Sequence, residues 1–90
     1  MAKITKTGLR RILTDRLKLK DALFELEELS RGKISGSVVS DSFQGLKDSE
    51  RQRRIWDALD EELGKESTRV VGTLLAYTQA EWNVDLEESN

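Results

Sequence analysis

Residues 39–56 read VSDSFQGLKDSERQRRIW, and this stretch decides the fold. It leaves the β-rich run 33–40, turns at Gly45 and enters a helical pattern over residues 49–63. The apolar positions of that pattern recur at i, i+4 and i+8, on one stripe of a helix: Ile55, Leu59 and Leu63. We therefore expect a strand that leads through a glycine turn into an amphipathic helix.

Two amphipathic helices are predicted. In residues 5–18 the leucines and isoleucine fall on one helical stripe, while the opposite face is mostly cationic. The helix at 49–63 has Asp48 or Ser49 as its expected N-cap, because a short polar side chain can accept a free backbone N–H there. Gly64 follows it at the position where a left-handed C-terminal cap is usual.

The strand assignments are less uniform. Residues 22–29, ALFELEEL, alternate apolar and acidic residues as a strand would, although Leu and Glu favour a helix on propensity alone. Residues 69–77, RVVGTLLAY, form the most β-rich run and predict a strand. A helical turn over 78–82 is then expected, with Thr78 as N-cap and Glu81 at the capping-box position.

Length and charge limit the class of protein. Ninety residues make one domain with a small core. With 15 Lys plus Arg and 17 Asp plus Glu, the net charge of −2 excludes a uniformly basic nucleic-acid-coating protein. Residues 1–20 nevertheless carry seven cations and one anion, so this cationic face could dock an acidic partner or a phosphate backbone. Residues 84–90 are expected to be a disordered acidic tail.

The missing residue types exclude several kinds of chemistry. Without Cys or His the chain can form no disulfide, no thiol nucleophile, no Ser–His–Asp triad and no Cys/His zinc site. No apolar run approaches 18 residues, and the N-terminus has no apolar signal region. We therefore expect a cytoplasmic protein without membrane contact, and a binding module more than an enzyme.

The chain resembles the BolA-like family, the stress-induced morphogen group. The family pattern is V-S-D-x-F-x-G, followed by R-H-R, an apolar pair with an aromatic, and two spaced leucines. The matching residues are Val39, Ser40, Asp41, Phe43, Gly45, Arg51, Arg53, Ile55, Trp56, Leu59 and Leu63. Tyr77, Thr78, Glu81 and Trp82 are similar to the family's close, and Phe24-Glu25-Leu26 to its first strand, which assigns residues 22–29 to a strand.

The resemblance implies an α+β fold of the class II KH-like type. The expected order is α-β-β-α-β-α, with a three-stranded mixed sheet and helices packed on one face. A short turn makes the first two strands antiparallel, and a helical crossover favours parallel pairing of the second and third. Residues 1–90 would then be a single BolA-like domain.

The resemblance also implies a partner protein that is not an enzyme. Family members bind monothiol glutaredoxins and help to ligate a shared two-iron, two-sulfur cluster, and some regulate transcription on DNA. This sequence departs from the family at the ligands: the third-strand histidine falls at Val70, and two further family histidines fall at Lys33 and Gln52. We therefore expect no cofactor and no metal site.

The candidate binding residues surround the start of the second long helix. Gly45, Lys47, Arg51, Arg53 and Arg54 are expected to bind nucleic acid or a protein partner, because arginine donors and a helix N-terminus both suit phosphate. The alternative is a solvated helix start neutralised by neighbouring acids. Val70 and Trp82 are the candidate partner contacts, and the alternative for Trp82 is packing within its own helical turn.

The first functional hypothesis is an interaction module for a monothiol glutaredoxin-like protein, without cluster ligation by this chain. The alternative is a transcriptional regulator that binds DNA or RNA through Arg51–Arg54. An enzyme based on carboxylates, lysines and Tyr77 is a third hypothesis, although no residues are spaced for it. We expect a monomer or a weak homodimer.

Overall fold

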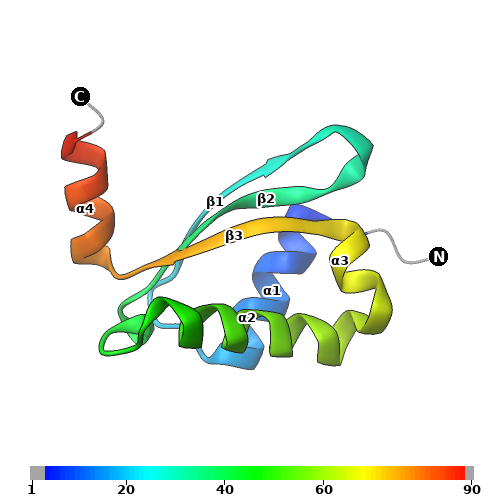
Figure 1. The fold of residues 1–90 in the computed structure, drawn as a ribbon, viewed down its shortest axis with the longest axis horizontal. Helices are drawn as coiled ribbons and strands as arrows, with labels where there is room; N and C mark the ends of the chain where they lie inside the picture. Colours follow the sequence, from blue (N-terminus) through cyan, green and yellow to red (C-terminus); the bar gives the residue numbers. More distant parts are fainter. Residues whose placement is uncertain (1–3, 89–90) are drawn as a thin grey trace.

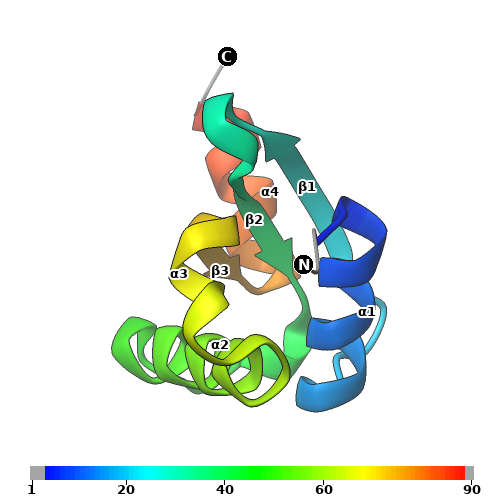
Figure 2. The same ribbon diagram turned by 90° about the vertical axis from the view of Figure 1, so that its right-hand side faces the viewer.

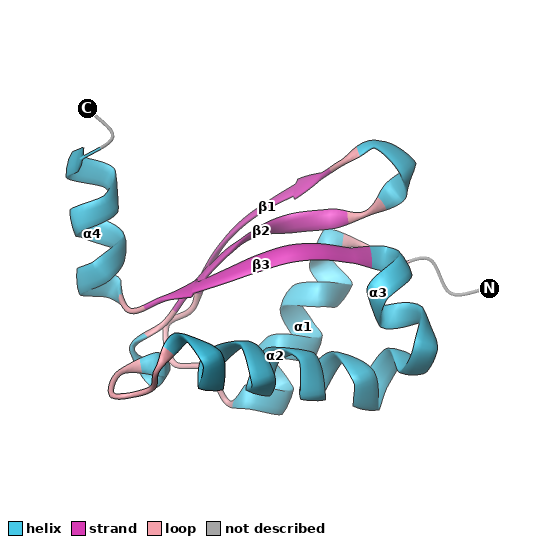
Figure 3. Cartoon of the chain, in the orientation of Figure 1, coloured by secondary structure: helices cyan, strands magenta, loops and turns pink. Residues whose placement is uncertain are grey.

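A computed structural model describes the backbone of residues 4–88 and the side chains of residues 4–30 and 32–84. The order of elements confirms the α-β-β-α-β-α prediction, with one extra short helix before the last strand (Figure 3). The helices and strands are α1 (Lys6–Leu17), β1 (Leu23–Glu28), β2 (Ile34–Val39), α2 (Asp48–Leu63), α3 (Ser67–Val70), β3 (Val71–Tyr77) and α4 (Gln79–Glu88).

The three strands form one mixed sheet in the order β1-β2-β3, with β1 antiparallel and β3 parallel to β2. Gly36 lies in the middle strand with a φ of 151°. A Cβ at this position would lie 1.9 Å from the carbonyl oxygen of Glu25, so only glycine lets β1 approach β2 here. The sheet confirms the predicted strand at 22–29, where intrinsic propensity favours a helix and strand pairing prevails.

The core lies between the sheet and helices α1 and α2, which cover one face of it (Figures 1 and 2). The predicted stripes supply it: Leu9 and Leu13 from α1, and Ile55 and Leu59 from α2, are all fully buried. Helix α4 leaves the end of β3 and rises on the side of the sheet away from α1 and α2 (Figure 1). Within residues 4–88, no helix packs along the length of the opposite sheet face.

The start of β3 and the first cap of α2 differ from the predictions. Residues 69 and 70 were expected in the strand, but they form the end of α3, which is held by a 2.6 Å hydrogen bond from Ser67 to Asp60. Helix α2 begins after Lys47 without a side-chain cap, and Asp48 lies inside its first turn. An acidic side chain there favours the helix N-terminus through the dipole instead.

The C-terminal helix is longer than the expected turn at 78–82, since α4 continues to Glu88. This differs from the disordered tail predicted for residues 84–90, because 84–88 continue the helix that Thr78 and Glu81 nucleate. Residues 89 and 90 lie outside the described residues. None of the helices within residues 4–88 has the length and hydrophobicity that crossing a bilayer requires.

Candidate functional site

Arg51 joins three parts of the molecule. Its side chain is buried, and its Nε donates to the Leu46 carbonyl at 2.9 Å. Its Nη1 donates to the Ala76 carbonyl at 3.2 Å and lies 2.6 Å from the Glu81 carboxylate. The guanidinium thus fixes the loop before α2, the end of β3 and the start of α4 to one another.

The contacts that Arg51 makes with the loop before α2, the end of β3 and the start of α4 are called the joint below. Glu81 completes the joint through the predicted capping box, which the structure confirms. Its carboxylate accepts from the Thr78 N–H at 2.8 Å, and its own N–H donates to the Thr78 hydroxyl at 3.3 Å. The Arg51 hydrogen bond, followed by the Thr78 N–H, lowers the pKa of Glu81 from 4.5 to about 2.

The loop that follows β2 is held against the end of α1 and the start of α4. The Ser40 hydroxyl donates to the Lys20 carbonyl at 2.9 Å, and Asp41 accepts from the Gln79 N–H at 3.0 Å. Phe43 is buried in the core, and Gly45 takes the left-handed φ of 82° that the expected turn requires. Gly45 is exposed.

The predicted cations around this loop divide into two groups. Lys47, Arg53 and Arg54 are exposed, and none of them forms an ion pair with another described residue. Arg51 instead has its donors engaged within the fold. We correct the expected site accordingly: Arg51 positions α4, and only the other three cations can meet a ligand without breaking the joint.

Sequence reasoning did not connect these cations with the end of α1. The backbone N–H of Lys20 donates to the Ser42 hydroxyl at 3.1 Å, which brings the turn after α1 beside the loop before α2. A hollow there is lined by residues of both segments and of the adjoining helices, among them Lys18 and, from α2, Arg54. The cationic run at 1–20 was the only sequence signal for this neighbourhood.

The two candidate partner contacts lie at opposite ends of β3. Trp82 packs on Tyr77 with ring centroids 5.3 Å apart, at the end of the strand. Val70 precedes the start of the strand, where Val71 pairs with Ile34. At ~3.3 Å per strand residue the two contacts are about 20 Å apart, so β3 and its ends would have to act as one extended surface.

The Val70 end of the sheet does not fit an iron–sulfur cluster. Val70 is half-buried against the core, and Lys33 offers an exposed ammonium rather than a soft ligand. Gln52, at the third family histidine position, donates its amide to the Leu74 carbonyl at 2.7 Å. Among the side chains that the structure describes, no three metal-binding groups gather.

Exposed apolar side chains gather around the sheet face that α1 and α2 leave open. Leu23 on β1 and Leu75 on β3 are 41% and 45% exposed, and they share the parity of Tyr77 along the strands. Together with the Tyr77–Trp82 stack, Leu23 and Leu75 form the open face, the name used below for these four residues.

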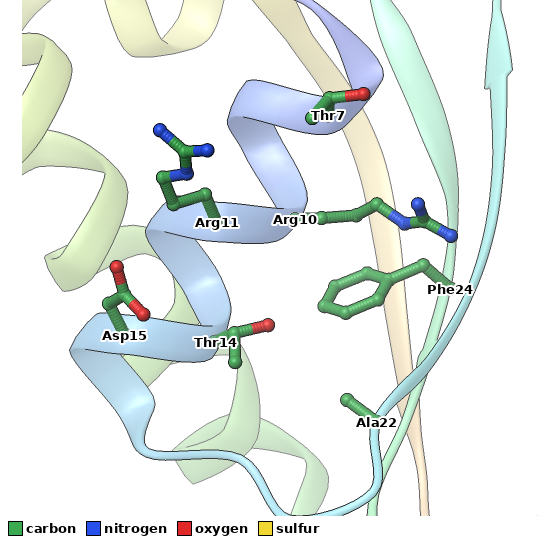
Figure 4. Close-up of a pocket in the computed structure, with 7 residues that line it drawn as sticks. All are labelled: Thr7, Arg10, Arg11, Thr14, Asp15, Ala22 and Phe24. Carbon is green, nitrogen blue, oxygen red and sulfur yellow. The ribbon is translucent and has the colours of Figure 1, made fainter.

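A depression of about 370 Å³ lies between α1 and β1 (Figure 4). Arg10 extends over the ring of Phe24, with its guanidinium carbon 5.9 Å from the ring centroid. Arg11 and Asp15 lie on the other side of the helix from Phe24 (Figure 4). Because these groups do not converge, the depression holds a cation–π contact between α1 and β1 rather than a ligand site.

No protein-family model and no curated protein matches this chain. Among solved structures, the BolA domain of SufE1 from Arabidopsis thaliana is 27% identical, with a TM-score of 0.61 over 87% of this chain and 98% of that domain. A bol-like protein from Babesia bovis is 20% identical with a TM-score of 0.67, over 94% of this chain and 96% of that chain. A bolA protein homologue from Coxiella burnetii is 17% identical with a TM-score of 0.66, over 89% of this chain and 97% of that chain.

Proposed function

We propose that this chain, which belongs to the BolA-like family, is a protein-interaction module without enzymatic activity. Its first expected partner is a monothiol glutaredoxin-like protein, in iron–sulfur or stress-response regulation. The observation that carries the proposal is the open face, where two leucines, Leu23 and Leu75, remain exposed on the sheet face that also carries the packed Tyr77–Trp82 pair. A cluster of exposed apolar side chains on a protein surface more often marks a site of protein contact than a surface that stays in contact with water.

The arrangement of the open face suits a protein partner. Trp and Tyr are enriched among the residues that contribute most to interface energy, and the Tyr77–Trp82 pair is already packed in place by α4. The Arg51–Glu81 ion pair fixes α4, so little conformational entropy is lost when a partner docks there. The surface from Val70 along β3 to Trp82, about 20 Å long, fits within a standard interface of ~800 Å² per partner.

A cluster would have to be held by the partner alone. The chain has no Cys and no His, so it has no thiolate or imidazole to offer. We therefore propose binding of the glutaredoxin-like protein without cluster ligation by this chain, and we expect similar affinity for the cluster-loaded and cluster-free partner.

The test is a titration of the isotope-labelled chain with a monothiol glutaredoxin, loaded and unloaded, followed by amide chemical shifts. We expect the largest shifts in residues 73–77 and 79–84. Leu75→Glu should weaken binding at least tenfold, because it places a charge in a desolvated contact. Leu29→Glu is the matched control, since Leu29 is 43% exposed but lies outside β3 and α4. Absence of binding, or equal losses in both variants, would refute the proposal.

Nucleic-acid binding is the second candidate. The observation in its favour is the exposure of Lys47, Arg53 and Arg54 around the start of α2, without ion pairs to other described residues. On duplex DNA the affinity should then fall with salt, with a log–log slope near −0.9 per phosphate neutralised. Changing all three cations to Gln, with Arg51 kept, should remove about three phosphate contacts and so make the log–log slope less negative by about 2.7. Absence of binding at low salt would eliminate this candidate.

A further inference from the structure

A hollow of about 130 Å³ lies between the turn after α1 and the loop before α2. Its lining is of two kinds. Leu17, Leu46 and the buried Phe43 supply apolar surface, and Arg16, Lys18 and Arg54 supply cations. No carboxylate is among its lining residues. Apolar walls combined with one sign of charge require an occupant that is both apolar and anionic.

Two of the three cations keep their charge available. Arg16 is neutralised by Glu61 and Glu62, at 2.7 Å from each. Lys18 and Arg54 form no ion pair with any residue of the described chain. The hollow therefore has one paired cation and two unpaired ones, and the unpaired charges can meet carboxylates without breaking a contact of the fold.

Lys18 occupies a backbone position that lysine disfavours. It ends α1 with a φ of 52° in the left-handed region, where glycine or asparagine is usual. Non-glycine residues in this region are strained, and such strain clusters at functional positions. The fold would thus tolerate the loss of the Lys18 side chain, and the presence of lysine here calls for an explanation beyond stability.

The lining of the hollow offers no exposed aromatic ring on which a nucleobase could stack. The volume of the hollow is close to the ~150 Å³ of an engineered apolar cavity that takes up benzene, which leaves room for one apolar side chain. Bases are normally held by stacking on exposed aromatic rings. The ring that lines the hollow is Phe43, which is only 2% exposed and offers no such platform.

We propose that this hollow docks an acidic segment of a protein partner, with one apolar side chain inserted between Leu17 and Leu46 and flanking carboxylates bound by Lys18 and Arg54. The inference rests on the proposed role as an interaction module and adds the chemistry of a second contact, separate from the open face. Charge complementarity identifies the segment as acidic, and the lining of the hollow requires its apolar anchor.

The probe for the test is a fluorescein-labelled peptide with one leucine flanked on each side by two acidic residues. We expect weak, saturable binding that decreases with added salt, with amide shifts confined to residues 16–20, 42–46 and 54. Lys18→Asn and Arg54→Gln should each weaken binding about two- to fivefold, since each removes one exposed charge contact. Lys65→Asn is the charge-matched control and should change nothing, because Lys65 is exposed far from the hollow.

The Lys18→Asn variant also excludes a trivial explanation. Asparagine suits the left-handed backbone, so its unfolding midpoint should equal or exceed that of the native chain while its peptide affinity falls. Equal weakening by Lys65→Asn would show unspecific charge attraction and overturn the proposal. Unchanged affinity of a peptide whose leucine is replaced by serine, or no saturation at about 1 mM peptide, would overturn it as well.

Two further arms separate this proposal from the others. Shifts at the same residues with duplex DNA, at higher affinity than with the peptide, would overturn the acidic segment in favour of nucleic acid. Glutaredoxin shifts on β3 and α4 without peptide binding would refute the hollow and leave the proposed function intact. Peptide binding in the hollow without any glutaredoxin binding would refute the named partner and support the hollow.

Discussion

Arg51→Met removes the joint between the loop before α2, β3 and α4 while keeping an unbranched side chain in the same space. The Ala76 carbonyl then loses a buried charged donor, worth about 1.5–3 kcal/mol. The Glu81 carboxylate is 47% exposed, so water replaces much of its ion pair and its loss costs about 0.5–1 kcal/mol. Together these terms lower the free energy of unfolding by about 2–4 kcal/mol.

That loss is large for a domain of this size, whose free energy of unfolding is roughly 5–13 kcal/mol at ~0.05–0.15 kcal/mol per residue. Urea denaturation followed by circular dichroism should show a midpoint lowered by about 2–4 M, at a slope near ~1 kcal/mol per M. Tryptophan fluorescence should report a change already in the folded state, because α4 and Trp82 lose their anchor to α2.

Arg53→Met is the matched control, since Arg53 is a neighbouring arginine on the same helix but is exposed. It should change the free energy of unfolding by no more than about 0.5 kcal/mol. Arg51→Lys keeps the charge and loses the planar fork, so its effect should lie between those of the other two variants. An Arg51→Met midpoint within error of the native one would show that the buried guanidinium does not join these elements.

Three further changes test other parts of the structure. Glu81 has a pKa lowered to about 2, so its carboxylate stabilises the native state above pH 4.5, and this stabilisation is lost as the pH falls from 4.5 towards 2. In acid titrations of stability, Glu81→Gln should therefore remove about 1 kcal/mol of the pH dependence, after allowance for solvent screening. Gly36→Ala should cost more than about 3 kcal/mol or prevent folding, as thermal unfolding would show, because the new Cβ would overlap the Glu25 carbonyl. Lys18→Gly should raise the free energy of unfolding in urea by up to about 1 kcal/mol by relieving the left-handed strain, and a decrease would contradict the backbone argument.

The sequence predicts most of the fold because its signals are local. The helical stripes, the glycine turn and the capping box each involve residues within a few positions of one another. The strand at 22–29 is different, since its local preference is helical and only the resemblance assigned it correctly. What decides it physically is pairing with β2 around Gly36, which joins residues that are distant in sequence: Glu25 pairs with Ser37, twelve positions away, and Leu26 with Gly36, ten positions away.

The candidate site is less predictable because its contacts join distant parts of the chain. Arg51 has the pattern of a phosphate-binding residue, but its partner Glu81 lies thirty positions away and turns it inward. The hollow likewise joins Lys18 to Arg54 through the Lys20–Ser42 contact, for which the sequence has no local signal. The left-handed φ of Lys18 likewise has no signal in the sequence, because a lysine is an unusual residue for a left-handed cap.

In the 39–56 motif, which carries the family resemblance, most of the residues that match the family pattern have a structural role. Ser40 binds the turn after α1, Asp41 caps the start of α4, Phe43 fills the core, Gly45 makes the turn and Arg51 joins three elements. Each of these side chains is needed for the joint whatever the protein binds. A match over this motif therefore carries information about the fold, while function has to be sought in residues that the joint does not use. Leu23 and Leu75 on the open face and the Lys18 and Arg54 charges at the hollow meet that condition, because none of these side chains takes part in the joint.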